Sequence, residues 1–177
     1  MKTDNGRTPL DDAHDLGHEG RAARSDHAAL RLWLRMLACT TQIEDEVRRR
    51  LRARFDISLP RFDYLAQLYR QPDGMKMKEL SRYLMVTGGN VTGVTEELVR
   101  DGLVSRENST RDRRAWIVSL TAKGRDAFAG MASEHERWIL ELFAGLDKAT
   151  VQQLHGQLGN LRLQVTRRQE EKHKEQR

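Results

Sequence analysis

Hydrophobic residues recur at helical spacing through most of this chain, with charged residues between them. The first such stretch predicts one long amphipathic helix over residues 26–56, which ends before Pro60. Its apolar positions are Leu30, Leu34, Leu37, Ile43, Val47 and Leu51. A second helix is predicted after Pro60 and is stopped by the turn signal Gln-Pro-Asp-Gly at residues 71–74. An arginine cluster at residues 48–54, near the end of the first helix, is either a solvated face or a phosphate-binding one.

The middle of the chain changes its hydrophobic period twice. Two short helices are predicted over residues 78–84 and 88–100, and such a closely connected pair is what a helix-turn-helix requires. Two short strands are then predicted at residues 103–106 and 115–120, where apolar and polar residues alternate. The segment between them, residues 107–114, is polar and rich in arginine, so the strands are expected to form a hairpin with a basic tip, a wing.

Helical spacing returns after the predicted hairpin. Thr121 is expected to cap a long helix. The apolar side of that helix carries Phe128, Met131, Trp138 and Leu142. Asp147 is expected to cap the last helix, whose apolar positions are Val151, Leu154, Leu158, Leu161 and Val165. Their spacing of three and four residues is typical of a seam that packs against a partner helix.

Composition and charge limit the classes of protein to which this chain can belong. The chain has 177 residues, of which 38% are hydrophobic and 32% charged, and no apolar run approaches the ~20 residues that span a bilayer. Residues 1–25 are polar and lack the pattern of a signal peptide, so we expect a disordered arm there and a charged tail at residues 169–177. The single cysteine, Cys39, fits a reducing cytoplasm. The net charge of +5 favours phosphate backbones or anionic ligands without choosing between them.

Motifs of catalysis and metal binding are missing from the sequence. No glycine loop has a spacing that cradles phosphate, and no nucleophile elbow is present. Gly88 and Gly89 follow a predicted helix and turn rather than a strand, so they make a poor nucleotide motif. The histidines do not have the spacing of a metal site. We therefore expect no enzyme activity, no cofactor and no metal.

These elements together predict a mostly α fold with a small β-hairpin wing. Residues 57–124 are expected to form a winged helix-turn-helix domain. Residues 26–56 are expected to supply a first helix for dimerisation and for a ligand pocket, and residues 125–168 the C-terminal dimerisation helices.

The helix at residues 88–100 is the candidate recognition helix, because a helix in the major groove needs small or hydrogen-bonding residues on its outer face. The residues expected to pack inward are Val91, Val94 and Leu98. The candidate DNA contacts are Gly88, Gly89, Asn90, Thr92, Gly93 and Thr95. Gly88 and Gly89 could instead only build the turn. Gly93 costs about 1 kcal/mol relative to alanine in a helix interior, which close approach to DNA or to a neighbouring helix would explain.

The predicted wing adds four candidate DNA-binding residues, Arg111, Asp112, Arg113 and Arg114. Arginine at a hairpin tip fits the narrow, electronegative minor groove and neutralises phosphate. Asp112 would repel phosphate, so it is expected to pair with Arg114 and fix the loop. Taken alone, a basic hairpin is as often a solvated turn, but its place after a helix-turn-helix favours the DNA-binding interpretation.

Short motifs in this segment resemble those of the MarR-type transcriptional regulators. They are Glu79-Leu80-Ser81, Val86-Thr87, Asn90-Val91-Thr92, Leu98-Val99, Asp101-Gly102-Leu103-Val104, Arg106, Asp112-Arg113-Arg114 and Leu120-Thr121-Ala122-Lys123-Gly124. With the flanking helices, the resemblance covers residues 28–168. It implies a homodimeric repressor whose winged lobes bind a palindromic DNA operator, with the recognition helix in the major groove and the wing arginines in the minor groove.

Three further stretches look similar to a subgroup that controls the degradation of aromatic acids or their coenzyme A thioesters. They are residues 30–35, 59–62 and 85–93. This resemblance implies release of DNA by a small aromatic carboxylate or acyl-CoA-type effector, bound where the first two helices meet the winged lobe. The candidate effector-binding residues are Arg31, Trp33, Arg35, Met36, Cys39, Arg61, Phe62 and Tyr69.

Each of these candidates has an ordinary alternative. The apolar residues could be core residues, and the arginines could be surface charges. Cys39 could instead sense oxidants, which would make the protein a redox-sensing repressor. A winged-helix module that binds protein rather than DNA is a further alternative. The main prediction is a cytoplasmic regulator whose partners are double-stranded DNA, a second copy of itself and a small aromatic effector, and not a membrane.

Overall fold

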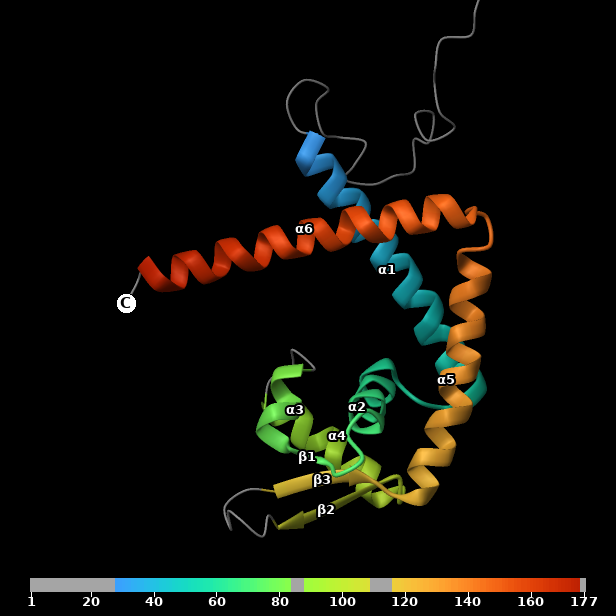
Figure 1. The fold of residues 1–177 in the computed structure, drawn as a ribbon. Helices are drawn as coiled ribbons and strands as arrows, with labels where there is room; N and C mark the ends of the chain where they lie inside the picture. The colour runs from blue at the N-terminus through green and yellow to red at the C-terminus, as the bar shows by residue number, and fades with distance from the viewer. Residues whose placement is uncertain (1–27, 84–87, 109–115, 176–177) are drawn as a thin grey trace, which may run out of the picture. The chain divides into compact units, whose positions relative to one another are not determined.

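The computed structural model of the protein describes residues 28–83, 88–108 and 116–175. Its elements in chain order are α1 (Ala28–Phe55), α2 (Leu59–Tyr69), β1 (Met75–Lys76), α3 (Met77–Tyr83), α4 (Gly88–Arg100), β2 (Val104–Asn108), β3 (Trp116–Leu120), α5 (Ala122–Leu142) and α6 (Lys148–Glu175). The chain divides into two compact units, residues 1–131 and residues 132–177. The predicted fold class, mostly helical with a small β sheet, is confirmed (Figure 1).

Three arginines of the cluster near the end of α1 form ion pairs within the helix. Arg48 lies 3.1 Å from the carboxylate of Glu44. Arg49 and Arg50 both pair with Glu46, at 2.7 and 2.6 Å, and these hydrogen bonds lower the pKa of Glu46 to about 2. Opposite charges three or four residues apart support the helix that carries them. For these three arginines, pairing within the helix favours a solvated face over a phosphate-binding one.

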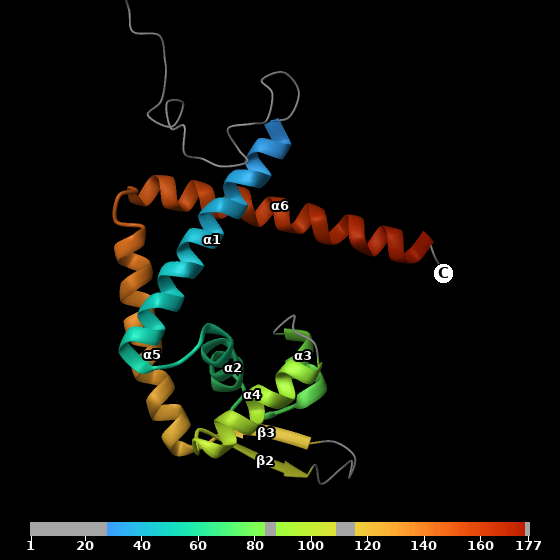
Figure 2. The same cartoon turned by 180° about the vertical axis from the view of Figure 1, so that it is seen from behind.

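A three-stranded antiparallel sheet lies in the first unit, in the order β1-β3-β2. β3 pairs with β2 along its whole length, with Val104 opposite Leu120 and Arg106 opposite Val118. The sequence predicted the β2–β3 hairpin but not β1, because two residues cannot show an alternating pattern. Figures 1 and 2 show α2, α3 and α4 together on one side of this sheet, so the core forms on that side.

The core of the first unit joins the end of α1 to the next three helices and the sheet. Its fully buried side chains are Leu51, Tyr64, Leu65, Leu68, Leu80, Val91, Thr95, Leu98 and Val118. Phe128 of α5 extends this core through ring contacts with Phe62 and Tyr69, whose centroids lie 5.4 and 5.0 Å away. The start of α5 is thereby packed against α2.

Capping hydrogen bonds at the end of α4 and the start of α5 fix where the chain enters and leaves the β2–β3 hairpin. Gly102 follows α4 with φ of 70°, and its N–H donates to Val99 O at 3.0 Å. The next amide donates to Leu98 O at 2.9 Å, which completes a Schellman cap. Thr121 caps α5 as predicted, because its Oγ1 accepts the Gly124 N–H at 2.9 Å. The chain therefore leaves α4 and enters α5 at defined points.

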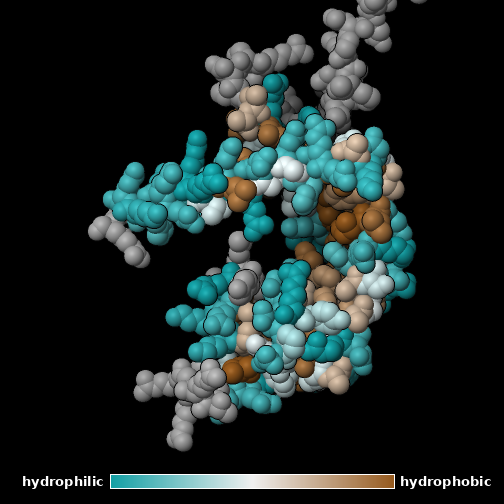
Figure 3. Space-filling view, viewed as in Figure 1, coloured by the Kyte–Doolittle hydropathy of each residue, from teal (hydrophilic) through white to brown (hydrophobic). Residues whose placement is uncertain are grey.

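The second unit is helical through most of its described part. Asp147 caps α6 as predicted, since its carboxylate accepts the Thr150 N–H at 2.7 Å, a bond that lowers the pKa of Asp147. None of the residues of α6 is buried in this single chain. The apolar positions Val151, Leu154, Leu158, Leu161 and Val165 are 37–48% exposed. In Figure 3, brown atoms lie along the middle of α6, whereas its far end is hydrophilic.

Candidate nucleic-acid interface

Helix α4 has one buried line and one exposed face. The inward line consists of Val91, Thr95 and Leu98, which are at most 2% exposed. Their spacing of four and three residues places them on one side of the helix. Val94, which the hydrophobic pattern placed inward, is only half-buried because Thr95 occupies that line. Thr92 and Gly93 lie on the exposed face.

Thr95 is a core residue, which corrects the expectation that it contacts DNA. Its Oγ1 donates to Val91 O at 2.7 Å, so the Tyr64 hydroxyl of α2, 2.6 Å away, is left to donate to Thr95. A fully buried side chain offers no surface to a base or a phosphate. Burial also raises the pKa of Tyr64 to about 12, so its hydroxyl keeps the proton that it donates. Tyr64 therefore ties the middle of α4 to α2, a role that was not predicted.

Gly93 lies in the middle of α4 with open space around it. A Cβ added there would meet no atom of the described residues within 4 Å. A neighbouring helix therefore does not explain this glycine, although it costs about 1 kcal/mol relative to alanine. Open space alone does not explain the glycine, because Gly130 of α5 and Gly156 and Gly159 of α6 are equally open. Close approach to DNA stays a prediction for Gly93.

The other predicted DNA contacts are described only in part. Gly88, Gly89 and Asn90 form the first turn of α4, and their side chains lie outside the described residues. The wing residues Arg111, Asp112, Arg113 and Arg114 also lie outside them. The strands on either side of the wing tip are described, and there the Arg106 guanidinium of β2 lies 4.1 Å from the ring centroid of Trp116 on β3. This contact joins the two strands close to the wing tip.

Arg61, predicted as an anchor for an effector carboxylate, is engaged by the end of α4. It lies in the first turn of α2, and its guanidinium pairs with the Asp101 carboxylate and, at 3.9 Å, with that of Glu97. Lys123 of α5 donates to the backbone carbonyl of Asp101 at 2.8 Å. The structure thus gives Arg61 carboxylate partners from its own chain, and the sequence indicated neither of them.

The remaining effector candidates lie on two helices, α2 and α1. Phe62 is a core residue in contact with Phe128, which is the alternative that the sequence left open for it. Tyr69 also packs on Phe128 but is 38% exposed. On α1, Trp33 is 56% exposed and the Cys39 thiol is exposed. The other α1 candidates are Arg31 and Arg35, both exposed, and Met36, which is half-buried.

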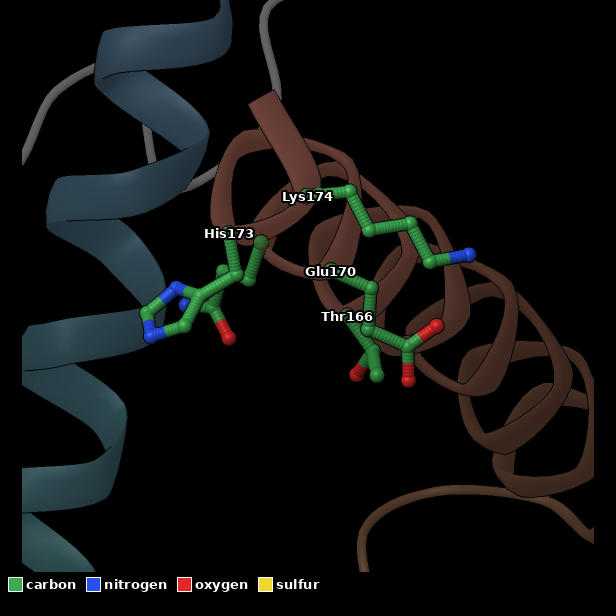
Figure 4. A pocket seen from close by; sticks show the side chains of 5 residues that line it. Thr166, Glu170, His173 and Lys174 are labelled. Carbon is green, nitrogen blue, oxygen red and sulfur yellow. The ribbon is translucent and has the colours of Figure 1, made fainter. Parts of the chain in front are cut away.

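An open pocket of about 390 Å³ lies along the last turns of α6. Its lining residues are Thr166, Gln169, Glu170, His173 and Lys174 (Figure 4). None of them belongs to the predicted effector set, and charged or polar side chains of a single helix make up the whole lining. Small-molecule sites are mostly apolar and enclosed, so this pocket does not replace the predicted effector site.

Two further kinds of site do not occur in the described ranges. Among residues 28–83, 88–108 and 116–175, no three His, Cys, Asp or Glu side chains come together as a metal ion would need. None of the helices within these ranges combines the length and the apolar composition of a bilayer-spanning segment.

Comparison with known proteins gives a consistent match. A model of the MarR family matches residues 57–116. The transcriptional activatory protein BadR of Rhodopseudomonas palustris is 32% identical over 106 residues, which cover 59% of this chain and 60% of BadR. The chain spans between 51% and 60% of the length of BadR and of three curated relatives from Bacillus subtilis.

Solved structures match over more of the chain. The crystal structure of a MarR family transcriptional regulator from Silicibacter pomeroyi is 30% identical, with a TM-score of 0.69 over 80% of this chain and 99% of that one. The S. aureus MepR–DNA complex is 22% identical, with a TM-score of 0.63 over 78% of this chain and 97% of that one. At this lower identity the second match shows a shared fold alone. The helices and the three-stranded sheet match those of MarR winged helix structures.

Proposed function

Because this chain belongs to the MarR family of transcriptional regulators, we propose that it is a DNA-binding repressor that acts as a homodimer on a palindromic operator. The observation that carries the proposal is the division of α4 into a buried line and an exposed face containing Thr92 and Gly93. Thr92 is short and Gly93 has no side chain, so the part of this face that they form can approach base edges in the major groove. The longer side chains of Glu96, Glu97 and Arg100 are exposed further along the helix. Family and fold are those of transcriptional regulators rather than of enzymes.

The proposed DNA contacts divide between α4 and the wing. On α4 the contacts are assigned to Gly88, Gly89, Asn90, Thr92 and Gly93, with base reading by Asn90 and Thr92 and close approach of the backbone at the glycines. Asn90 pairs with an adenine edge, and Thr92 reaches a base or a phosphate. In the wing, Arg111, Arg113 and Arg114 contact phosphates and the minor groove, while Asp112 holds Arg114.

Homodimerisation is supported by the apolar surface that a single chain leaves in contact with water. The spaced leucines and valines of α6 are 37–48% exposed, and Leu140, Leu142, Phe143 and Leu146 add to them at the end of α5 and after it. Apolar side chains exposed at heptad-like spacing along a helix are typical of a surface that packs against a partner. We assign dimerisation to residues 26–56 and 125–168, with residues 57–124 as the DNA-binding domain. A two-fold dimer would present two copies of α4 to half-sites about one helical turn apart.

A double substitution in the wing tests DNA binding. The wild-type protein is first used to select an operator duplex from a randomised library. Arg113→Ala/Arg114→Ala should then weaken operator binding and reduce the slope of log affinity against log salt by about 0.9 for each phosphate that the variant no longer neutralises. Lys172→Ala/Lys174→Ala removes the same charge from exposed positions near the end of α6, outside the segments assigned to DNA binding and dimerisation, and serves as the matched control. Unchanged affinity and slope in the wing variant would contradict the proposal.

For the effector, we propose an aromatic carboxylate or its coenzyme A thioester. The support is the resemblance of residues 30–35, 59–62 and 85–93 to regulators of aromatic-acid degradation. Benzoate-type acids and their thioesters, added to the protein–operator complex, should release the duplex. Release by hydrogen peroxide instead, abolished in Cys39→Ser, would assign redox control.

Activation is the second candidate for the direction of regulation, because BadR is named a transcriptional activatory protein. A reporter gene placed behind the selected operator separates the two. Deleting the regulator raises reporter expression if it represses and lowers expression if it activates.

A further inference from the structure

Arg61 and Asp101 occupy helix ends that disfavour their charges. Arg61 lies in the first turn of α2, where the helix dipole is positive. Asp101 directly follows the last residue of α4, where the dipole is negative. Neither charge is therefore favourable for the helix that carries it. The ion pair between them, formed by residues 40 positions apart in the chain, offsets both.

The Arg61 side chain is well placed to hold the end of α4 in one orientation. It is only 20% exposed, and its Nε is buried without a hydrogen-bond partner, 3.9 Å from the Glu97 carboxylate. Glu97 and Asp101 are four residues apart, so they lie one turn apart on the same side. The guanidinium donates a hydrogen bond to the Asp101 carboxylate and lies at ion-pair distance from that of Glu97, so it holds the end of α4 at two successive turns.

Two further contacts hold α4, one in the core and one at the surface. Tyr64, one turn after Arg61 on α2, bonds to the buried Thr95 at 2.6 Å. Lys123 of α5 donates to the Asp101 carbonyl at 2.8 Å. The middle of α4 is thus tied to α2, and its end is tied to both α2 and α5. These groups control where the helix lies, whereas the exposed residues of α4 control what it contacts.

We propose that Arg61 is a positioning residue for sequence reading by α4. The inference rests on the proposed DNA-binding function. Base-edge hydrogen bonds specify sequence and tolerate little displacement of the helix, whereas contacts of long side chains to phosphate are independent of sequence. Loss of Arg61 therefore lowers the preference for operator over other DNA, while affinity for other DNA is retained.

The test compares two duplexes of equal length, the operator selected by the wild-type protein and a scrambled version. Arg61→Gln should lower the operator-to-scrambled affinity ratio by about tenfold, the effect of roughly one mismatched base pair. Lys172→Gln, which removes the same charge from an exposed position outside the segments assigned to DNA binding and dimerisation, should leave the ratio unchanged. Asp101→Asn should give a similar loss, and the double variant should lose no more than either single variant. Arg61→Lys, which keeps the charge but not the guanidinium, should fall between wild type and Arg61→Gln.

Each other outcome has a defined meaning. An unchanged ratio in Arg61→Gln would overturn the proposal. Equal loss of affinity for both duplexes, together with a lower melting temperature, would show that Arg61 only supports the fold, and this would also overturn it. A wild-type protein that selects no duplex would instead contradict the proposed DNA-binding function itself.

Discussion

Gly93→Ala adds one methyl group to the exposed face of α4. In the protein alone this methyl group would meet no described atom within 4 Å, so it adds no steric strain. Alanine is favoured over glycine in a helix interior by about 0.8–1 kcal/mol, and the free energy of unfolding should rise by this amount. For a chain of 177 residues, a gain of this size raises the melting temperature by about 2–4 °C.

The same methyl group should weaken operator binding. If the face that contains Gly93 lies against DNA, an added methyl group in a packed contact costs about 1–3 kcal/mol. This corresponds to an increase of about 5- to 150-fold in the dissociation constant. Stability and affinity would then change in opposite directions, which a general folding defect cannot produce.

Thermal unfolding and fluorescence anisotropy with the selected operator measure the two effects separately. Gly130→Ala is the matched control, because Gly130 is exposed on α5 and an added Cβ there also meets nothing within 4 Å. Gly130 lies in a segment assigned to dimerisation, so sedimentation first checks that Gly130→Ala keeps the oligomeric state of the wild type. The control should then gain stability and keep its affinity. A raised melting temperature with unchanged affinity in Gly93→Ala would refute the placement of this residue against DNA. A lowered melting temperature would refute the reasoning about open space.

Two other substitutions test contacts that hold α4 and the chain that directly follows it. In Gly124→Ala the new Cβ would clash with the backbone carbonyl of Leu103, so we expect a loss of more than about 2 kcal/mol in urea unfolding. Stability within about 0.5 kcal/mol of wild type would contradict this close approach. Tyr64→Phe removes the hydrogen bond to Thr95 and should cost about 1 kcal/mol at neutral pH. Because burial raises the pKa of Tyr64 from 10.0 to about 12, the native state keeps a proton that the unfolded state releases, and wild-type stability should fall as pH rises through this interval. The alkaline loss should be smaller in Tyr64→Phe, and equal slopes in the two proteins would rule out this origin.

The elements could be predicted where a local pattern is long enough to repeat. α4 has the bounds expected from its capping signals and hydrophobic spacing. β1 was missed because its two residues form a strand only through pairing with β3, 40 or more positions later. β2 extends to Asn108, beyond the predicted end at residue 106, because Asn108 pairs with Trp116 across the hairpin. Pairing between distant segments carries no local signal in the sequence.

The candidate site shows the same limit at the level of single side chains. Hydrophobicity alone placed Val94 inside, whereas the structure buries Thr95. That burial costs little because Val91 O and the Tyr64 hydroxyl satisfy the Thr95 hydroxyl. Tyr64 is 31 positions from Thr95 in the chain. The hydrophobic pattern around Thr95 therefore cannot show the partner that makes its burial favourable. Arg61 was predicted as a ligand anchor for the same reason, since its carboxylate partners come from the far end of α4.

The two proposed effects on α4 must be coupled if both are correct. Gly93→Ala can cost affinity only while the exposed face of α4 lies close to DNA, and Arg61 is proposed to keep it there. In an Arg61→Gln background, the added methyl group should therefore cost less, with a coupling of at least about 0.5 kcal/mol in operator binding. The effects on unfolding should instead add, because the position of the new Cβ touches neither Arg61 nor its partners. If the fold-changes in operator affinity simply multiplied, Arg61 would not act through the placement of the face that contains Gly93.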